Sequence, residues 1–91
     1  MTRTSSKDIQ RLVDLLNKLT DSPAEPWAGQ GATFKANVGC FHIEHAYGAP
    51  RLVRMVTEGG GERDISPRLP NGELARWINA YIAGFETAKR G

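Results

Sequence analysis

The chain has 91 residues, with 12 Lys and Arg against 10 Asp and Glu, a formal net charge of +2. Hydrophobic residues make up 40% and charged residues 24%, a balance that is typical of a folded domain and excludes an intrinsically disordered chain. The length predicts a single small globular domain over residues 1–91, and the weak, interspersed charge does not by itself indicate a nucleic-acid-binding protein.

Targeting signals are not apparent in the sequence. The first 25 residues lack the uninterrupted apolar run of a signal peptide, and no segment has the roughly 20 apolar residues that cross a bilayer. Cys40 is the single cysteine, so an internal disulfide is excluded. We therefore expect a cytoplasmic protein without a membrane partner.

The amino-terminal segment predicts an amphipathic helix over residues 5–20. Its apolar positions recur at three- and four-residue spacing: Ile9, Leu12, Val13, Leu16 and Leu19. Ser5, followed by Asp8, resembles a capping box at the helix start. Residues 21–31 contain two prolines and predict a loop, in which we expect Trp27 to lay its ring over the edge of the core.

From Ala32 the apolar period changes to two, which predicts a three-stranded antiparallel sheet over residues 32–57. The first strand carries Phe34, Ala36 and Val38 on one face. The second and third strands form a hairpin. Residues 58–70 predict a connection; Glu62 to Leu69 could add an edge strand, but Pro67 and Pro70 favour an irregular path.

The last segment predicts a helix over residues 71–88, with Asn71 as its cap. Its apolar residues follow the helical period throughout: Leu74, Trp77, Ile78, Tyr81, Ile82 and Phe85. Two helices with one apolar stripe each can both pack on one face of the sheet. The sequence therefore predicts a two-layer α+β domain in the order helix, three-stranded antiparallel sheet, helix.

The hairpin segment GCFHIEHAYGAPRLVRMV (39–56) holds most of the reactive side chains. Pairing His45 with Arg51 would turn four apolar residues toward the helices: Phe41, Ile43, Val53 and Met55. A slip of one residue would pair Phe41 with Arg54 and mix the two faces. The preferred register leaves Cys40, His42, Glu44, Leu52, Arg54 and Val56 on the outer face.

Cys40, His42 and Glu44 on that outer face are residue types that bind zinc. Side chains at positions i and i+4 of a strand lie about 13 Å apart, so the three cannot reach one ion. No oxyanion motif or third orienting group supports a Cys–His nucleophile. We expect no enzymatic activity, metal or cofactor, with a small metal-dependent enzyme as the minor alternative.

The half-apolar outer face favours a protein partner, either a second copy of the chain or a different protein. The expected partner-binding residues are His42, Glu44, Tyr47, Arg51, Leu52, Arg54 and Val56. The alternative is a nucleic-acid-binding module, because an aromatic and basic cluster can hold a single strand. Its residues would be Lys35, Tyr47, Arg51 and Arg54.

Residues 47–86 combine a Tyr-Gly hairpin turn, an Arg-Leu-Val-Arg strand, a glycine-rich turn and an amphipathic helix ending in Ala-Gly. This run resembles small proteins encoded in bacteriophage and prophage genomes. The resemblance implies a viral accessory protein in a bacterial cytoplasm that binds a host or phage component. It implies no particular site residues.

Overall fold

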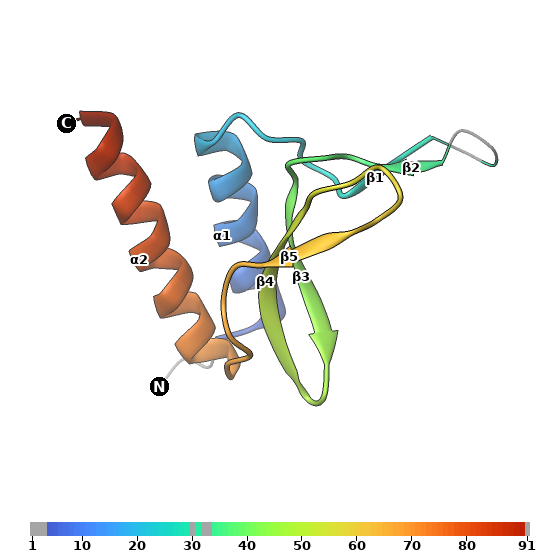
Figure 1. The fold of residues 1–91 in the computed structure, drawn as a ribbon. Coiled ribbons are helices and arrows are strands. Elements are labelled where there is room, and N and C mark those ends of the chain that lie inside the picture. The colour runs from blue at the N-terminus through green and yellow to red at the C-terminus, as the bar shows by residue number, and fades with distance from the viewer. Residues whose placement is uncertain (1–3, 30, 32–33, 91) are drawn as a thin grey trace.

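The fold was analysed in a computed structural model, which describes residues 4–29, 31 and 34–90. The elements are α1 (Ser6–Leu19), β1 (Trp27–Ala28), β2 (Lys35–Ala36), β3 (Phe41–Ala46), β4 (Ala49–Met55), β5 (Glu62–Asp64) and α2 (Asn71–Arg90). The predicted α+β class is confirmed, and α1 and α2 lie on the same side of the β3–β4 hairpin (Figure 1). Within the described residues, neither helix has the length and apolar content of a membrane span.

Helix α1 begins as its sequence predicts. The Ser5 hydroxyl accepts from the Asp8 backbone N–H at 3.3 Å, and the Asp8 carboxylate accepts from the Ser5 N–H at 2.8 Å. These two bonds form the predicted capping box, which satisfies donors that a helix start leaves without partners.

Asn17 lies on the buried face of α1 and is 2% exposed. Its side-chain Nδ2 donates to the Phe41 carbonyl at 2.9 Å, and its Oδ1 accepts from the Phe41 N–H at 2.8 Å. Because β3 is at the edge of its sheet, the Asn17 amide takes the place of a neighbouring strand at this point.

Helix α2 begins at Asn71 and extends to Arg90, two residues beyond the predicted end. The prediction of Asn71 as the cap is wrong, because it is already helical and its side-chain amide points to the Thr4 carbonyl at 3.5 Å. At the other end, Lys89 Nζ donates to the Leu19 carbonyl at 3.1 Å. Lys89 of α2 thus provides a hydrogen-bond donor to the carboxyl end of α1, whose last carbonyls lack partners within the helix.

The sheet is composed differently from the prediction. Its order is β3-β4-β5, so the third strand comes from Glu62–Asp64 in the expected connection, and β2 pairs instead with β1. A turn over residues 37–40 separates β2 from β3, with Gly39 at φ 98° and Cys40 N–H bonded to the Asn37 carbonyl at 3.2 Å. The two-residue β2 therefore does not continue into the main sheet. Pro67 and Pro70 follow β5, so they end the strand pairing only after this third strand has formed.

The predicted hairpin register is wrong by one residue. Phe41 pairs with Arg54, Ile43 with Leu52, and Glu44 with Arg51. Tyr47 and Gly48 form a two-residue turn between Ala46 and Ala49, with φ values of 51° and 77°. Positive φ at both central positions defines a type I′ turn, and this turn, not face composition, sets the register.

A single main core lies between the helices and the hairpin. Its buried residues are Ile9, Val13, Leu16, Phe41, Leu52, Leu74, Ile78 and Ile82. Arg54 is also on the helix-facing side of the sheet. Its guanidinium lies over the Phe41 ring, 4.5 Å from the centroid, so the positive charge is stabilised by the aromatic face. A second small cluster holds Ala36, Cys40 and Met55.

Candidate interaction surfaces

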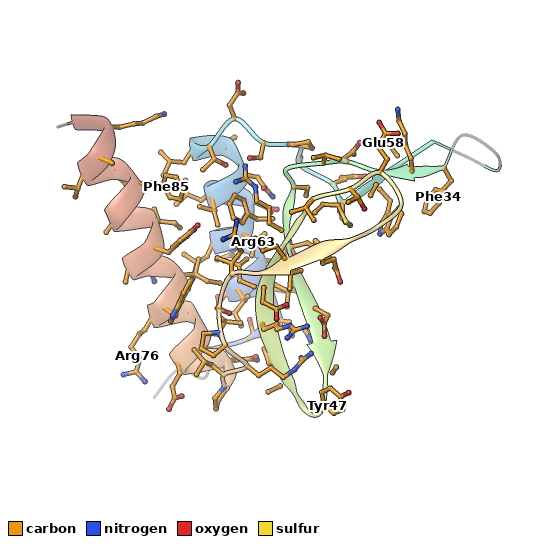
Figure 2. The ribbon with its side chains drawn as sticks, viewed as in Figure 1. Phe34, Tyr47, Glu58, Arg63, Arg76 and Phe85 are labelled. Carbon is orange, nitrogen blue, oxygen red and sulfur yellow. The ribbon has the colours of Figure 1, made fainter. Side chains whose placement is uncertain are left out.

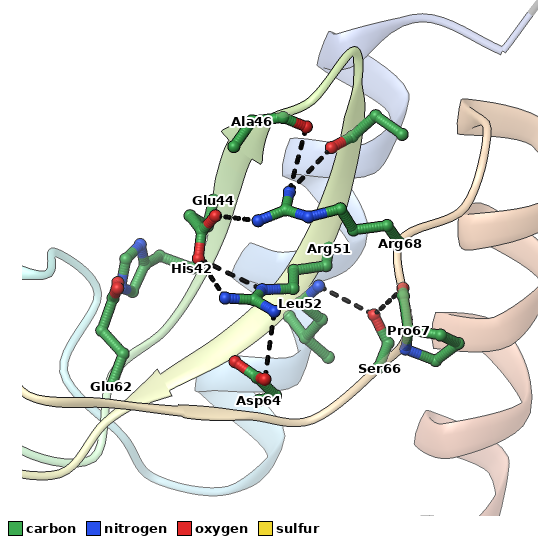
Figure 3. A network of polar contacts seen from close by, with 11 residues as sticks. His42, Glu44, Ala46, Arg51, Leu52, Glu62, Asp64, Ser66, Pro67 and Arg68 are labelled. Carbon is green, nitrogen blue, oxygen red and sulfur yellow. Dashed lines mark hydrogen bonds and ion pairs between the residues drawn. The ribbon is translucent and has the colours of Figure 1, made fainter.

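The face of the sheet away from the helices carries a charged network centred on Glu44 (Figure 3). Arg51 donates from Nε and Nη2 to Glu44 Oε2 at 3.1 and 2.6 Å, and from Nη1 to Asp64 Oδ2 at 3.0 Å. Arg68 donates to the other Glu44 oxygen. Two guanidinium groups thus meet two carboxylates, so this part of the face is nearly neutral.

The network lowers the pKa of the Glu44 carboxyl, first through the hydrogen bond from Arg68 and then through that from Arg51. The same Glu44 hydrogen bond raises the pKa of Arg51. Both shifts favour the charged forms, which is the behaviour of a structural ion-pair network.

Arg68 also fixes the hairpin turn. Its Nη1 donates to the Ala46 and Ala49 carbonyls at 3.2 and 3.0 Å, and its guanidinium lies 5.2 Å from the centroid of the Tyr47 ring. Tyr47 itself is 94% exposed. The structure therefore places the expected binding residues Glu44, Arg51 and Tyr47 near one another.

His42 lies on the same outer face as Glu44. Its Nε2 is 2.8 Å from Glu62 Oε2 but outside hydrogen-bond geometry, so the contact is an attraction only when the imidazole is protonated. Val53, which pairs with His42, is fully buried although it faces away from the helices.

Leu52, Arg54 and Val56 do not belong to this face, and their assignment to it is corrected. Leu52 is 0% exposed in the main core, because the actual register turns it toward the helices. Arg54 also lies on the helix side, where its Nε donates to the Gly39 carbonyl at 2.9 Å. Val56 follows β4, is exposed and lines a cleft against α2. The outer face is therefore charged rather than half-apolar.

Cys40 is fully buried, unlike the other two candidate metal ligands, His42 and Glu44. It is 0% exposed in the cluster with Ala36 and Met55, and burial raises the pKa of its thiol. A higher pKa lowers the thiolate fraction that nucleophiles and metal ligands require. In the part of the chain that the structure describes, no group of three His, Cys, Asp or Glu side chains is arranged to hold a metal ion.

The four residues of the nucleic-acid alternative do not form one surface. Lys35 is in β2 and lies 4.0 Å from Glu58, whereas Tyr47 is at the tip of the β3–β4 hairpin, away from Glu58 (Figure 2). Arg51 is held by Glu44 and Asp64 on the outer face, and Arg54 lies on the helix side. A single strand could not contact all four as one cluster.

Exposed apolar side chains lie instead at the end of the molecule that carries β1 and β2. We call Trp27 and Phe34, which are 39% and 55% exposed, the apolar end patch. Val38 and Val56 are also exposed, but they line the cleft against α2. Trp27 and Phe34 stack with centroids 5.0 Å apart and an interplanar angle of 8°. The expected position of Trp27 over the core edge is therefore wrong.

Several tertiary contacts hold this end together. The Ala36 N–H donates to the Glu58 carbonyl at 2.9 Å, which joins β2 to the turn after β4. Gly60 lies so close under the indole of Trp27 that a Cβ there would be 2.7 Å from its Cη2. The sequence signals for the patch were Phe34 in the apolar alternation and the isolated Trp27, but their common location depends on these tertiary contacts.

The chain was compared with protein families, curated proteins and solved structures. No family model, curated protein or solved structure matches the chain significantly.

Proposed function

We propose that the chain is a small non-enzymatic protein that binds another protein through the apolar end patch. The observation that carries the proposal is the Trp27–Phe34 stack, an aromatic pair left exposed outside the core. Aromatic side chains are enriched in the energetically dominant centres of interfaces, since each buries some 150–250 Å².

The patch also has the anatomy of an interface. Its apolar centre is bordered by Lys35 and Glu58, which provide a charged rim. Trp27 is supported from below by Gly60 and beside it by Phe34, so binding costs little side-chain entropy. By contrast, the Glu44 network on the outer sheet face already pairs its charges internally.

The phage-like context expected from residues 47–86 is part of this proposal, and it selects a bacterial lysate as the source of partners. A tagged chain would be incubated at moderate and at high salt with lysate that is either untreated or nuclease-treated. Capture should survive nuclease and salt, because an apolar interface depends little on ionic strength, whereas nucleic-acid binding falls steeply with salt.

Phe34→Ser should abolish the capture. Leu15→Ser is the matched control, because Leu15 is a similarly exposed apolar residue (48%) on α1. Sedimentation velocity on the purified chain distinguishes self-association from binding of a different protein. Capture that disappears with nuclease, or equal loss in both variants, would contradict the proposal.

A further inference from the structure

A cleft of about 600 Å³ lies between α2 and the β4–β5 pair. Its lining includes Val56 from the loop after β4, Arg54, Arg63 and Ile65 from the sheet side, and Trp77 and Tyr81 from α2. Figure 2 shows Arg63 in the space between the sheet and α2. The volume is within the range of small-molecule sites, roughly 300–1,000 Å³.

Arg54 and Arg63 are directly opposite in the β4–β5 register, so both side chains project from the same face. Like charges in that position destabilise a sheet unless an anion lies between them. Among the described residues, neither guanidinium has a carboxylate within 4.0 Å. Asp64 borders the cleft, but its Oδ2 accepts from Arg51 on the opposite face.

The position of Arg54 is fixed before any ligand binds. Its Nε is bonded to the Gly39 carbonyl and its guanidinium lies over Phe41. Its two Nη groups donate to no described residue. A pre-positioned guanidinium beside a second one is the arrangement that binds a doubly charged oxyanion.

The α2 wall of the cleft is aromatic. Trp77 and Tyr81 are stacked with centroids 5.2 Å apart, and Tyr81 also packs edge-on against Phe41 at 6.2 Å. Both rings are partly exposed and are held by the core. A flat ring entering the cleft would find an aromatic surface, itself packed against the core, on which to stack.

We propose that this cleft binds a phosphate monoester attached to a planar ring, with the phosphate between Arg54 and Arg63 and the ring against Trp77 or Tyr81. The dianionic phosphate removes the repulsion between the two arginines. Such chemistry is provided by a free nucleoside monophosphate or by the phosphorylated end of a nucleic-acid strand. The proposal does not depend on protein binding at the apolar end patch, because neither Trp27 nor Phe34 lines the cleft.

The test is an NMR titration of the whole chain with inorganic phosphate, adenosine, adenosine 5′-monophosphate, and a short single-stranded oligonucleotide with and without a 5′-phosphate. The monophosphate or the 5′-phosphorylated strand should bind saturably and more tightly than inorganic phosphate or adenosine. Whichever of the two binds tighter identifies the source of the phosphate.

Arg63→Gln should weaken that binding about tenfold or more, because a charge-assisted contact is lost. Without ligand, its melting temperature should equal or exceed that of the wild type, since the repulsion is relieved. Arg76→Gln removes the same charge from an exposed position that does not line the cleft, and should change affinity less than twofold. Phe34→Ser should leave the affinity unchanged.

Three results would overturn the proposal: no saturable binding of any phosphate compound at millimolar concentration, equal binding of adenosine and its monophosphate, or equal weakening by Arg63→Gln and Arg76→Gln. The last result would indicate a diffuse charge effect instead of a site.

Discussion

Asn17 is a polar residue in the apolar stripe of α1, and its side chain completes the backbone hydrogen bonding of Phe41. The periodicity of α1 could not reveal this role, because an asparagine next to an apolar stripe normally faces solvent. Its partner is 24 residues away in the chain. Only the docking of α1 on the edge of β3 brings the two together.

Asn17→Leu should lower the free energy of unfolding by about 2–4 kcal/mol, because it removes two hydrogen bonds and leaves two buried backbone groups unsatisfied. Urea denaturation followed by circular dichroism measures the change. Lys18→Ala, an exposed neighbour on the same helix, should change stability by less than about 0.5 kcal/mol. A loss as small as that for Asn17→Leu would contradict this role.

Glu44 should make stability depend on pH. Its folded-state pKa is below the usual 4.5, so the unfolded chain binds more protons, and stability falls as pH drops from about 5 through the folded pKa. Melting temperatures between pH 7 and pH 3 measure the effect. Glu44→Gln should flatten this dependence, while the part due to Asp8, whose pKa is lowered by Ser5, should remain. An unchanged pH profile in Glu44→Gln would refute the assignment.

At the scale of elements, the helices could be predicted and the strand pairing could not. The helical period is a local property that Ile9 to Leu19 and Leu74 to Phe85 carry by themselves. The hairpin register depends on the turn at Tyr47 and Gly48. The register predicted from the apolar content of each face was wrong, because Arg54 can lie on the apolar face by packing over an aromatic ring. Strand β5 has the sequence Glu-Arg-Asp, without any apolar signal.

Gly48→Ala should destabilise the hairpin, because φ at Gly48 is 77° and a side chain there costs about 1 kcal/mol. Gly59→Ala provides the comparison, since Gly59 is outside the positive-φ region and a Cβ would meet only Thr57 Oγ1 at 4.0 Å. That change should be neutral or slightly stabilising. Thermal unfolding of both variants measures the difference, and equal melting temperatures would argue against a turn-determined register.

At the scale of the whole molecule, one core joins α1, α2 and the hairpin, so damage at its centre should unfold everything together. The candidate surfaces are products of the same tertiary arrangement. The apolar end patch joins Trp27 of β1 to Phe34, which precedes β2, and the cleft combines residues of β4, β5 and α2. No local pattern could have predicted either combination.

Leu52→Asp should therefore abolish the cooperative unfolding transition and the dispersed amide spectrum, since an unpaired charge in the core costs more than about 4 kcal/mol. Leu15→Asp, at an exposed position on α1, should leave a folded chain. A folded Leu52→Asp variant would mean that Leu52 is on the surface, as the sequence-based register assumed.

The packing of α1 against α2 brings the first and last described elements side by side, and Lys89 reaches the end of α1. A ribosome synthesising about 5–20 residues per second needs on the order of 4 to 14 s to proceed from Leu19 to Arg90. During that interval the apolar faces of α1 and of the nascent hairpin have no covering helix. Folding of the core must then wait until α2 has been synthesised, and these faces are the segments that a nascent-chain chaperone would bind.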